Sequence, residues 1–196
     1  MAKIQTEKNT TKKEVILQKA AALFKTKSYT AASMRELADL VGVEAPSLYN
    51  HIGAKSELLR EICFKIGNEF IEQTDIIKNS PGTVTEKIGA IIRFHIKKMM
   101  ENFDEVFVAN HDWKHLPEPY LADFLTIRRT YEKSLVSLVE AGIANKEIKA
   151  INPYVAVLTI LSAVRGLEFW QRNKKNIPPQ VLEDDMVLHL LNGLVN

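Results

Sequence analysis

Apolar residues recur along most of the chain at spacings of three and four, which is the period of one face of an α-helix. No stretch shows the sustained alternation of apolar and polar residues that a half-buried strand requires. The pattern therefore predicts an all-α protein. Helices are expected over residues 11–27, as a pair within 33–52, over 55–77, 83–99, 120–144 and 153–173, and from 178 onward, with a short helix or irregular segment over 104–116.

Four local sequences mark where helices should begin. Thr11, Ser33 and Thr83 are each followed by a glutamate three residues later. This is the pattern of a capping box, in which each of the two side chains accepts a hydrogen bond from the other residue's backbone N–H. Asn152 followed by Pro153 predicts a cap with proline at the first helical position, where a missing N–H costs nothing.

The segment from Ser33 to Ile52 carries the most specific pattern. Ala38 is small where two helices must cross closely, and Gly42 follows where the turn needs a positive φ, which glycine adopts without strain. Pro46 suits the first turn of the second helix, and Leu48 fills the space between the two helices. This pattern is typical of a helix-turn-helix, whose second helix lies in the DNA major groove. The alternative is an ordinary αα-hairpin with a glycine cap.

The composition narrows the class of protein. With 196 residues, of which 46% are apolar and 26% charged, the chain can form one or two globular domains. No apolar run reaches the roughly 18 residues that span a bilayer, and the amino terminus lacks the apolar core of a signal peptide. The single cysteine, Cys63, excludes an internal disulfide and fits a reducing compartment. We therefore expect a cytoplasmic protein with no membrane partner.

Charge is distributed unevenly along the chain. Residues 1–55 carry nine lysines or arginines and five acidic residues, whereas the remaining residues carry 17 and 19. A basic amino-terminal part attracts phosphate, which agrees with DNA binding by the helix-turn-helix. A solvated, lysine-rich helix would produce the same imbalance.

Residues 13–59 resemble the TetR family of bacterial transcriptional regulators. The resemblance rests on four sequence elements: Ala20-Ala21-x-Leu23-Phe24, Ala38-x-x-x-Gly42-Val43, Ser47-Leu48-Tyr49-x-His51 and Lys55-x-x-Leu58. Ile52 departs from the family pattern, which usually has phenylalanine there, but it still supplies an apolar side chain. The resemblance implies an amino-terminal three-helix helix-turn-helix domain over residues 1–54 and a carboxy-terminal helical domain for effector binding and dimerisation over residues 55–196.

The same resemblance implies a function. The implied function is that of a homodimeric repressor, which binds a palindromic double-stranded DNA operator. A small-molecule effector that moves the fourth helix would release it from the DNA. Carried over by position, the DNA contacts would be Thr30, Arg35, Ser47, Tyr49, Asn50, His51 and Lys55, with Lys55 holding a phosphate. For each of them the alternative is an ordinary solvent-facing side chain. The alternative function is that of an all-α small-molecule carrier or enzyme in which the helix pair is incidental.

A further part of the chain resembles the TetR regulators that respond to acyl-CoA or related lipid-like acids. It comprises residues 111–119, Arg128 with Tyr131, and residues 141–143. The resemblance implies an apolar effector, and small-molecule pockets have apolar linings with a few polar groups. The candidate pocket residues are Phe94, Met99, Phe103, Phe107, Trp113, Arg128, Tyr131 and Trp170. The alternative for each is a place in the core, and Arg128 can pair with an anionic effector, with Glu132 or with an acid of a partner subunit.

Small residues form a stripe on the helix predicted over 153–173. Ala156, Thr159, Ala163 and Gly166 are spaced three or four apart, and small side chains let two helices approach closely. We expect this helix and the one over 120–144 to form a four-helix bundle across the two-fold axis of a homodimer. The alternative is that the stripe packs within the subunit.

Nothing in the sequence indicates catalysis or a bound cofactor, because it has neither a glycine-rich phosphate loop nor a nucleophile elbow. His111 and His115 are one helical turn apart, but this spacing without the flanking residues of a known site is a weak metal signal, so no metal is assigned. We therefore expect a DNA-binding protein that is not an enzyme.

Overall fold

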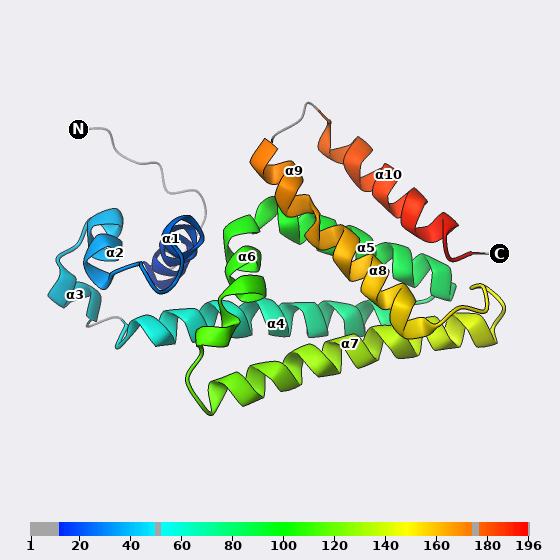
Figure 1. Cartoon of the computed structure of the whole chain (residues 1–196), viewed down its shortest axis with the longest axis horizontal. Helices are drawn as coiled ribbons and strands as arrows, with labels where there is room; N and C mark the ends of the chain where they lie inside the picture. Colours follow the sequence, from blue (N-terminus) through cyan, green and yellow to red (C-terminus); the bar gives the residue numbers. More distant parts are fainter. Residues whose placement is uncertain (1–11, 50–51, 174–176, 196) are drawn as a thin grey trace. The chain divides into compact units, whose positions relative to one another are not determined.

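The chain folds into helices joined by short loops (Figure 1). The computed structural model describes residues 12–49, 52–173 and 177–195. The elements are α1 (Lys12–Lys27), α2 (Met34–Val41), α3 (Ala45–Tyr49), α4 (Lys55–Asn79), α5 (Val84–Glu101), α6 (Phe103–His111), a 3-10 turn η1 (Trp113–His115), α7 (Tyr120–Ala144), α8 (Pro153–Arg165), α9 (Leu167–Asn173) and α10 (Pro179–Asn192). The all-α prediction is confirmed, since the described residues contain one isolated bridge, between Ile148 and Val195, and no strand.

The predicted helix starts at 83 and 152 are confirmed by their caps. Thr83 Oγ1 accepts from the N–H of Glu86 at 3.2 Å, and the Glu86 carboxylate accepts from the N–H of Thr83 at 2.7 Å. Asn152 Oδ1 accepts from two N–H groups in the first turn of α8, at 3.0 and 3.2 Å. The capping box predicted at Thr11 lies outside the described residues.

The prediction of one helix over 153–173 is wrong, because Gly166 interrupts it. α8 ends at Arg165 and α9 begins at Leu167. Gly166 still donates to the carbonyl of Ser162 at 3.0 Å, but a glycine inside a helix costs about 1 kcal/mol relative to alanine. None of the helices in the described ranges is long and apolar enough to cross a membrane.

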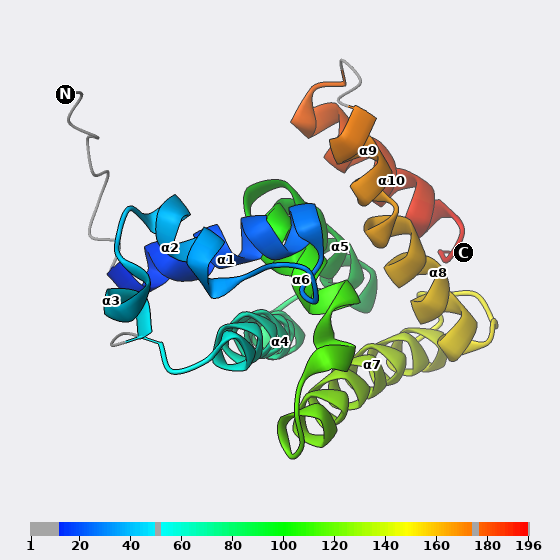
Figure 2. The ribbon, with the colours of Figure 1, turned by 60° about the vertical axis from the view of Figure 1, so that its left-hand side comes forward.

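The helices divide into two compact units. The first contains residues up to Ile66 together with Asp104–Phe124, and the second contains Gly67–Phe103 together with the residues from Leu125 onward. In the first unit, α1, α2 and α3 lie side by side in both views (Figures 1 and 2). The predicted domain boundary between residues 54 and 55 stays a prediction.

Each unit has its own apolar core. In the first, the side chains of Phe24, Leu37 and Leu48 are almost completely buried, which holds α1, α2 and α3 together. Burying one such side chain contributes about 1.5–3 kcal/mol. In the second, α5 packs against α8, α9 and α10. Gly89 lies where α5 meets α10, so that a Cβ there would already contact Leu191 at 3.4 Å.

Candidate nucleic-acid interface and effector site

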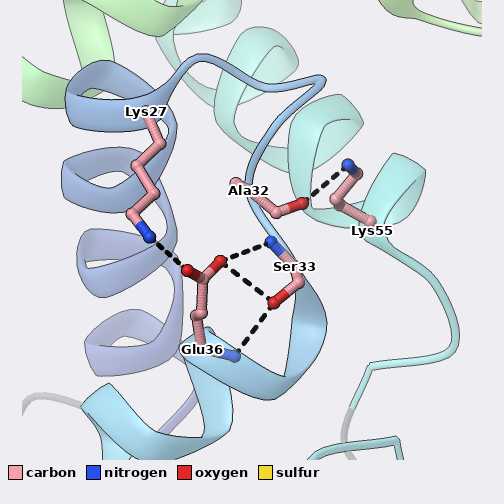
Figure 3. A network of polar contacts seen from close by, with 5 residues as sticks. All are labelled: Lys27, Ala32, Ser33, Glu36 and Lys55. Atoms are coloured by element: carbon pink, nitrogen blue, oxygen red, sulfur yellow. Dashed lines mark hydrogen bonds and ion pairs between the residues drawn. The ribbon is translucent and has the colours of Figure 1, made fainter.

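The start of α2 is held by polar contacts around Glu36 (Figure 3). Its carboxylate accepts from the Ser33 N–H at 3.0 Å, and its own N–H donates to Ser33 Oγ at 3.2 Å, so the predicted capping box is confirmed. Lys27, at the end of α1, forms an ion pair with the same carboxylate. The Lys27 ammonium and the Ser33 donors lower the pKa of Glu36 to about 2. These contacts link the end of α1 to the beginning of α2.

The turn between α2 and α3 has the predicted geometry. Gly42 adopts the left-handed conformation, with φ 77°, and its N–H donates to the Ala38 carbonyl at 2.9 Å. The N–H of Val43 donates to the same carbonyl at 3.0 Å. Ala38 is buried where the helices cross, and Leu48 is completely buried between them. The helix-turn-helix predicted from these residues is therefore present.

The outer face of α3 carries part of the predicted DNA contact. Tyr49 is 50% exposed, and Ser47 is half-buried. Pro46 lies in the first turn of the helix, as predicted. Asn50 and His51, which were expected to continue this face, lie outside the described residues.

Thr30 and Arg35 are both exposed near the start of α2, where a phosphate backbone can reach them. Thr30 Oγ1 lies 3.1 Å from Ser28 Oγ in a hydrogen bond. Their roles in DNA binding remain predictions, like those of the residues on α3.

Lys55 makes internal contacts that sequence reasoning missed. Its ammonium donates to the carbonyls of Tyr29 at 2.8 Å and Ala32 at 2.9 Å, and it lies 4.6 Å from the centre of the Tyr29 ring. The contact with Ala32 is visible in Figure 3. The side chain therefore ties the first turn of α4 to the loop before α2, and its predicted phosphate contact is untested.

The segment of α6 and η1 packs onto the same loop. The Tyr29 ring stacks on His115 with ring centres 5.4 Å apart, and the Tyr29 N–H hydrogen-bonds the buried Asp112 carboxylate. Burial raises the pKa of Asp112. His111 lies against Phe107, 4.4 Å between ring centres. Within the described residues, no group of three His, Cys, Asp or Glu side chains gathers as a metal site would require.

The predicted pocket residues divide between the two units. Phe107 and Trp113 belong to the first, and the others belong to the second. Of the latter, Phe94 and Tyr131 lie around Phe70, with ring centres 5.0 and 5.8 Å from its ring. Met99 is buried, whereas Phe103, Arg128 and Trp170 are half-buried. Their assignment to an effector pocket remains a prediction.

Sequence reasoning missed a cavity in the second unit, between α5, α7 and α8. Its volume is about 10 Å³, and its lining is entirely aliphatic: Ile88, Ile91, Ile92, Leu135, Leu138, Val139, Val157 and Ile160. The helical spacing of these residues is the same as that of ordinary core residues, so no sequence signal distinguishes them.

The buried His95 and the half-buried Tyr131 form a polar pair close to this aliphatic lining. His95 Nε2 and the Tyr131 hydroxyl form a hydrogen bond between α5 and α7. Burial, reinforced by the charge of Arg165, lowers the pKa of His95 to about 3, and burial raises the pKa of Tyr131. At neutral pH both side chains are therefore uncharged.

The predicted dimer stripe divides between the inside and the outside of the subunit. Ala156 is buried, whereas Thr159 is exposed. Large apolar side chains exposed nearby include Val155, Leu158 and Phe169, with exposed fractions of 55%, 52% and 70%. The dimer interface on this face remains a prediction.

Two family models match the chain. The model for bacterial regulatory proteins of the tetR family matches residues 16–62, and the model for the tetracyclin repressor-like C-terminal domain matches residues 81–194, more than half of the sequence. The chain belongs to the TetR family. It is thus a DNA-binding transcriptional regulator, with α2 and α3 as its helix-turn-helix.

Individual proteins of known name or structure agree with this assignment. The HTH-type transcriptional repressor KstR2 of Mycolicibacterium smegmatis is 21% identical over 135 residues, which are 68% of this chain and 66% of that protein. The structure of the ketosteroid transcriptional regulator KstR2 of Mycobacterium tuberculosis covers 97% of both chains with a TM-score of 0.88 and 18% identity. The structure of AibR in complex with isovaleryl coenzyme A and operator DNA covers 90% of this chain and 96% of AibR, with a TM-score of 0.79 and 22% identity. These two structures share the fold of this TetR-family chain.

Proposed function

We propose that this TetR-family protein represses transcription by binding a palindromic operator as a homodimer, and that an acyl-CoA or another lipid-like molecule releases it. The observation that carries the DNA-binding part is the pair α2 and α3. Leu48 anchors α3 from inside, while Tyr49 faces outward and Thr30 and Arg35 are exposed nearby. A short helix presented in this way suits the major groove, with the flanking side chains on phosphates.

The homodimer is supported by exposed apolar side chains on α8, α9 and α10. Leu158 on α8 and Phe169 on α9 are more than half exposed, and so is Leu188 on α10. α8 and α10 both pack against α5. Among the described residues of α7, no large apolar side chain is exposed to a similar degree. We therefore assign the dimer face to α8–α10, in place of the pairing with the helix over 120–144.

The effector part of the proposal rests on the aliphatic cavity. Small-molecule sites occupy roughly 300–1,000 Å³, far more than the about 10 Å³ between α5, α7 and α8. A ligand that enters there must separate these helices, and it stabilises the separated form by burying its own apolar surface. A ligand that favours one of two conformations in this way can act as a switch. AibR, which shares the fold, was crystallised with isovaleryl coenzyme A and operator DNA, and this favours an acyl-CoA.

α4 is the element through which we expect the switch to act. In the second unit, Phe70 of α4 packs on His95, with ring centres 4.6 Å apart. In the first unit, Lys55 of the same helix donates to the carbonyls of Tyr29 and Ala32. Both residues belong to the same helix, α4. A displacement at Phe70 would therefore be passed along α4 to the loop that precedes α2.

Two further parts of the proposal follow from the family. TetR-family regulators are generally not enzymes, and we assign no catalytic activity to this chain. A repressor acts where its DNA is, so we place the protein in the cytoplasm. An all-α carrier or enzyme with an incidental helix pair is the alternative, and it would bind ligands without preferring any DNA sequence.

Fluorescence anisotropy with a labelled duplex from the protein's own promoter region tests the DNA-binding part. The full chain should bind this duplex more tightly than a shuffled duplex of equal composition, with an affinity that falls steeply with salt. Arg35→Ala should weaken binding to both duplexes and should reduce the slope of log affinity against log salt concentration by about one. Arg129→Ala removes the same charge from an exposed position on α7 and serves as the matched control.

Equal affinity for the operator and the shuffled duplex at moderate salt would contradict the proposal. Equal effects of Arg35→Ala and Arg129→Ala would remove Arg35 from the DNA interface and leave only a general effect of charge. Isovaleryl coenzyme A added to the bound complex then tests release, which should appear as a fall in anisotropy.

A further inference from the structure

A buried hydroxyl without a hydrogen bond lies next to the His95–Tyr131 pair. Thr74 of α4 is 1% exposed, and its Oγ1 has no hydrogen-bond partner among the described residues. Its contact with the Tyr131 hydroxyl lowers the pKa of Tyr131 against the larger effect of burial, so the two hydroxyls lie close together. Phe70, one turn earlier on α4, lies with its ring centre 4.6 Å from that of His95.

An unpartnered buried hydroxyl calls for a physical reason, because most buried polar groups in native proteins are hydrogen-bonded. Valine has the same shape as threonine and would leave no polar atom unsatisfied. The hydroxyl at this position lies beside a second hydroxyl and an imidazole. A bound ligand could supply the hydrogen bond that Thr74 lacks within the chain.

The polar cluster continues directly from the aliphatic cavity. On α5, Ile91 and Ile92 line the cavity, and His95 follows about one turn later. On α7, Leu135 lines the cavity, and Tyr131 precedes it by one turn. Residues three or four apart share one face of a helix. The polar pair therefore lies at one end of an otherwise apolar interface between α5 and α7.

We propose that Thr74, His95 and Tyr131 bind an uncharged oxygen, a ketone carbonyl or a hydroxyl, that is carried on the apolar body of the effector. This inference rests on the proposed function only in placing the effector in this cavity. Thr74 can donate to a carbonyl and can also accept from a hydroxyl. A carboxylate fits poorly, because a buried anion needs a charged partner. The three side chains are uncharged, and Arg165, the nearby cation, is exposed to solvent.

Calorimetric titration of the DNA-free, full-length protein with 2-octanone, 1-octanol and octanoate at pH 7.5 tests the inference. The three probes share an eight-carbon chain and differ in the oxygen group. We expect the ketone and the alcohol to bind at least tenfold more tightly than the carboxylate. Octanoate affinity equal to that of 2-octanone would overturn the proposal, and so would the absence of 2-octanone binding up to its solubility limit.

Three variants test whether the preference for an uncharged oxygen comes from Thr74 and Tyr131. Thr74→Val should be at least as thermally stable as the natural protein, because it removes an unsatisfied group, yet it should bind 2-octanone about 3- to 10-fold more weakly. Thr74→Ser keeps the hydroxyl and should retain the affinity. Tyr131→Phe should weaken ketone binding in the same way as Thr74→Val. Unchanged ketone affinity in both Thr74→Val and Tyr131→Phe would overturn the proposal.

Operator binding and ligand binding are measured separately, so the two proposals can fail independently. Ketone binding without any preference for the operator would leave the cluster intact as a ligand site and would refute the proposed function. Operator binding without a ketone preference would support the proposed function and would refute the cluster as a ligand site.

Discussion

Lowering the pH from 7.5 to 5.5 should destabilise the protein through His95. Burial and the charge of Arg165 lower the pKa of this imidazole from 6.5 to about 3 in the folded protein. Unfolding restores the ordinary pKa, so the unfolded chain takes up a proton that the folded protein does not bind. The stabilising contribution is therefore fully present above about pH 6.5, and it is lost progressively as the pH falls toward 3.

The size of the effect follows from proton linkage. At pH 5.5 the imidazole is about 90% protonated in the unfolded chain and still neutral in the folded one, which lowers the free energy of unfolding by about 1.4 kcal/mol relative to pH 7.5. At pH 5.0 the loss reaches about 2 kcal/mol. Total stabilities of about 5–15 kcal/mol make a change of this size measurable.

Urea unfolding followed by circular dichroism at pH 7.5, 6.5, 5.5 and 5.0 measures how the free energy of unfolding changes with pH. The variant His95→Gln serves as the control. Glutamine cannot titrate in this range and keeps a polar group near Tyr131. The natural protein should lose about 1.4 kcal/mol more than the variant between pH 7.5 and 5.5. The comparison cancels Asp112, whose raised pKa acts in the opposite direction in both proteins. A variant that loses stability as steeply as the natural protein would refute the assignment to His95.

Two other substitutions test the role of Lys55 and the proposed dimer face. Lys55→Met removes donors to the Tyr29 and Ala32 carbonyls, and should lower the free energy of unfolding by about 2 kcal/mol, measured in urea. The salt slope of operator binding should stay unchanged, and a slope reduced by about one would instead support the phosphate contact. Leu158→Glu should convert the dimer to monomers in sedimentation velocity, because it buries a charge in the proposed interface. Ile76→Glu, at an equally exposed apolar residue of α4, should leave the dimer intact, and a dimer preserved in Leu158→Glu would place the interface elsewhere.

The features that could be predicted from the sequence depend on neighbouring residues. The capping box of Ser33 with Glu36 and the left-handed turn at Gly42 each need only a few residues, and both are present. The bounds 120–144 agree with α7, because the prolines before it and the loss of apolar periodicity after it are local signals. The break at Gly166 was missed, since a single glycine in a periodic stretch does not always end a helix.

The features that could not be predicted depend on residues far apart in the sequence. The family position of Lys55 predicts a phosphate ligand, whereas its internal acceptors lie 23 and 26 residues earlier in the chain. The contact between His95 and Tyr131 spans 36 residues and depends on how α5 and α7 pack. Thr74 carried no signal at all, because an unsatisfied hydroxyl can be recognised only once its surroundings are known.

The small volume of the cavity between α5, α7 and α8 also has a kinetic consequence. An effector that enters there waits for the helices to separate, so its observed association rate should level off at high concentration, at the rate of opening. Its apparent affinity is the intrinsic affinity reduced by the fraction of molecules that are open. Substitutions that loosen the packing of Ile92 or Val157 would thus strengthen effector binding without touching the effector, and the sensitivity of the switch can be tuned through the core.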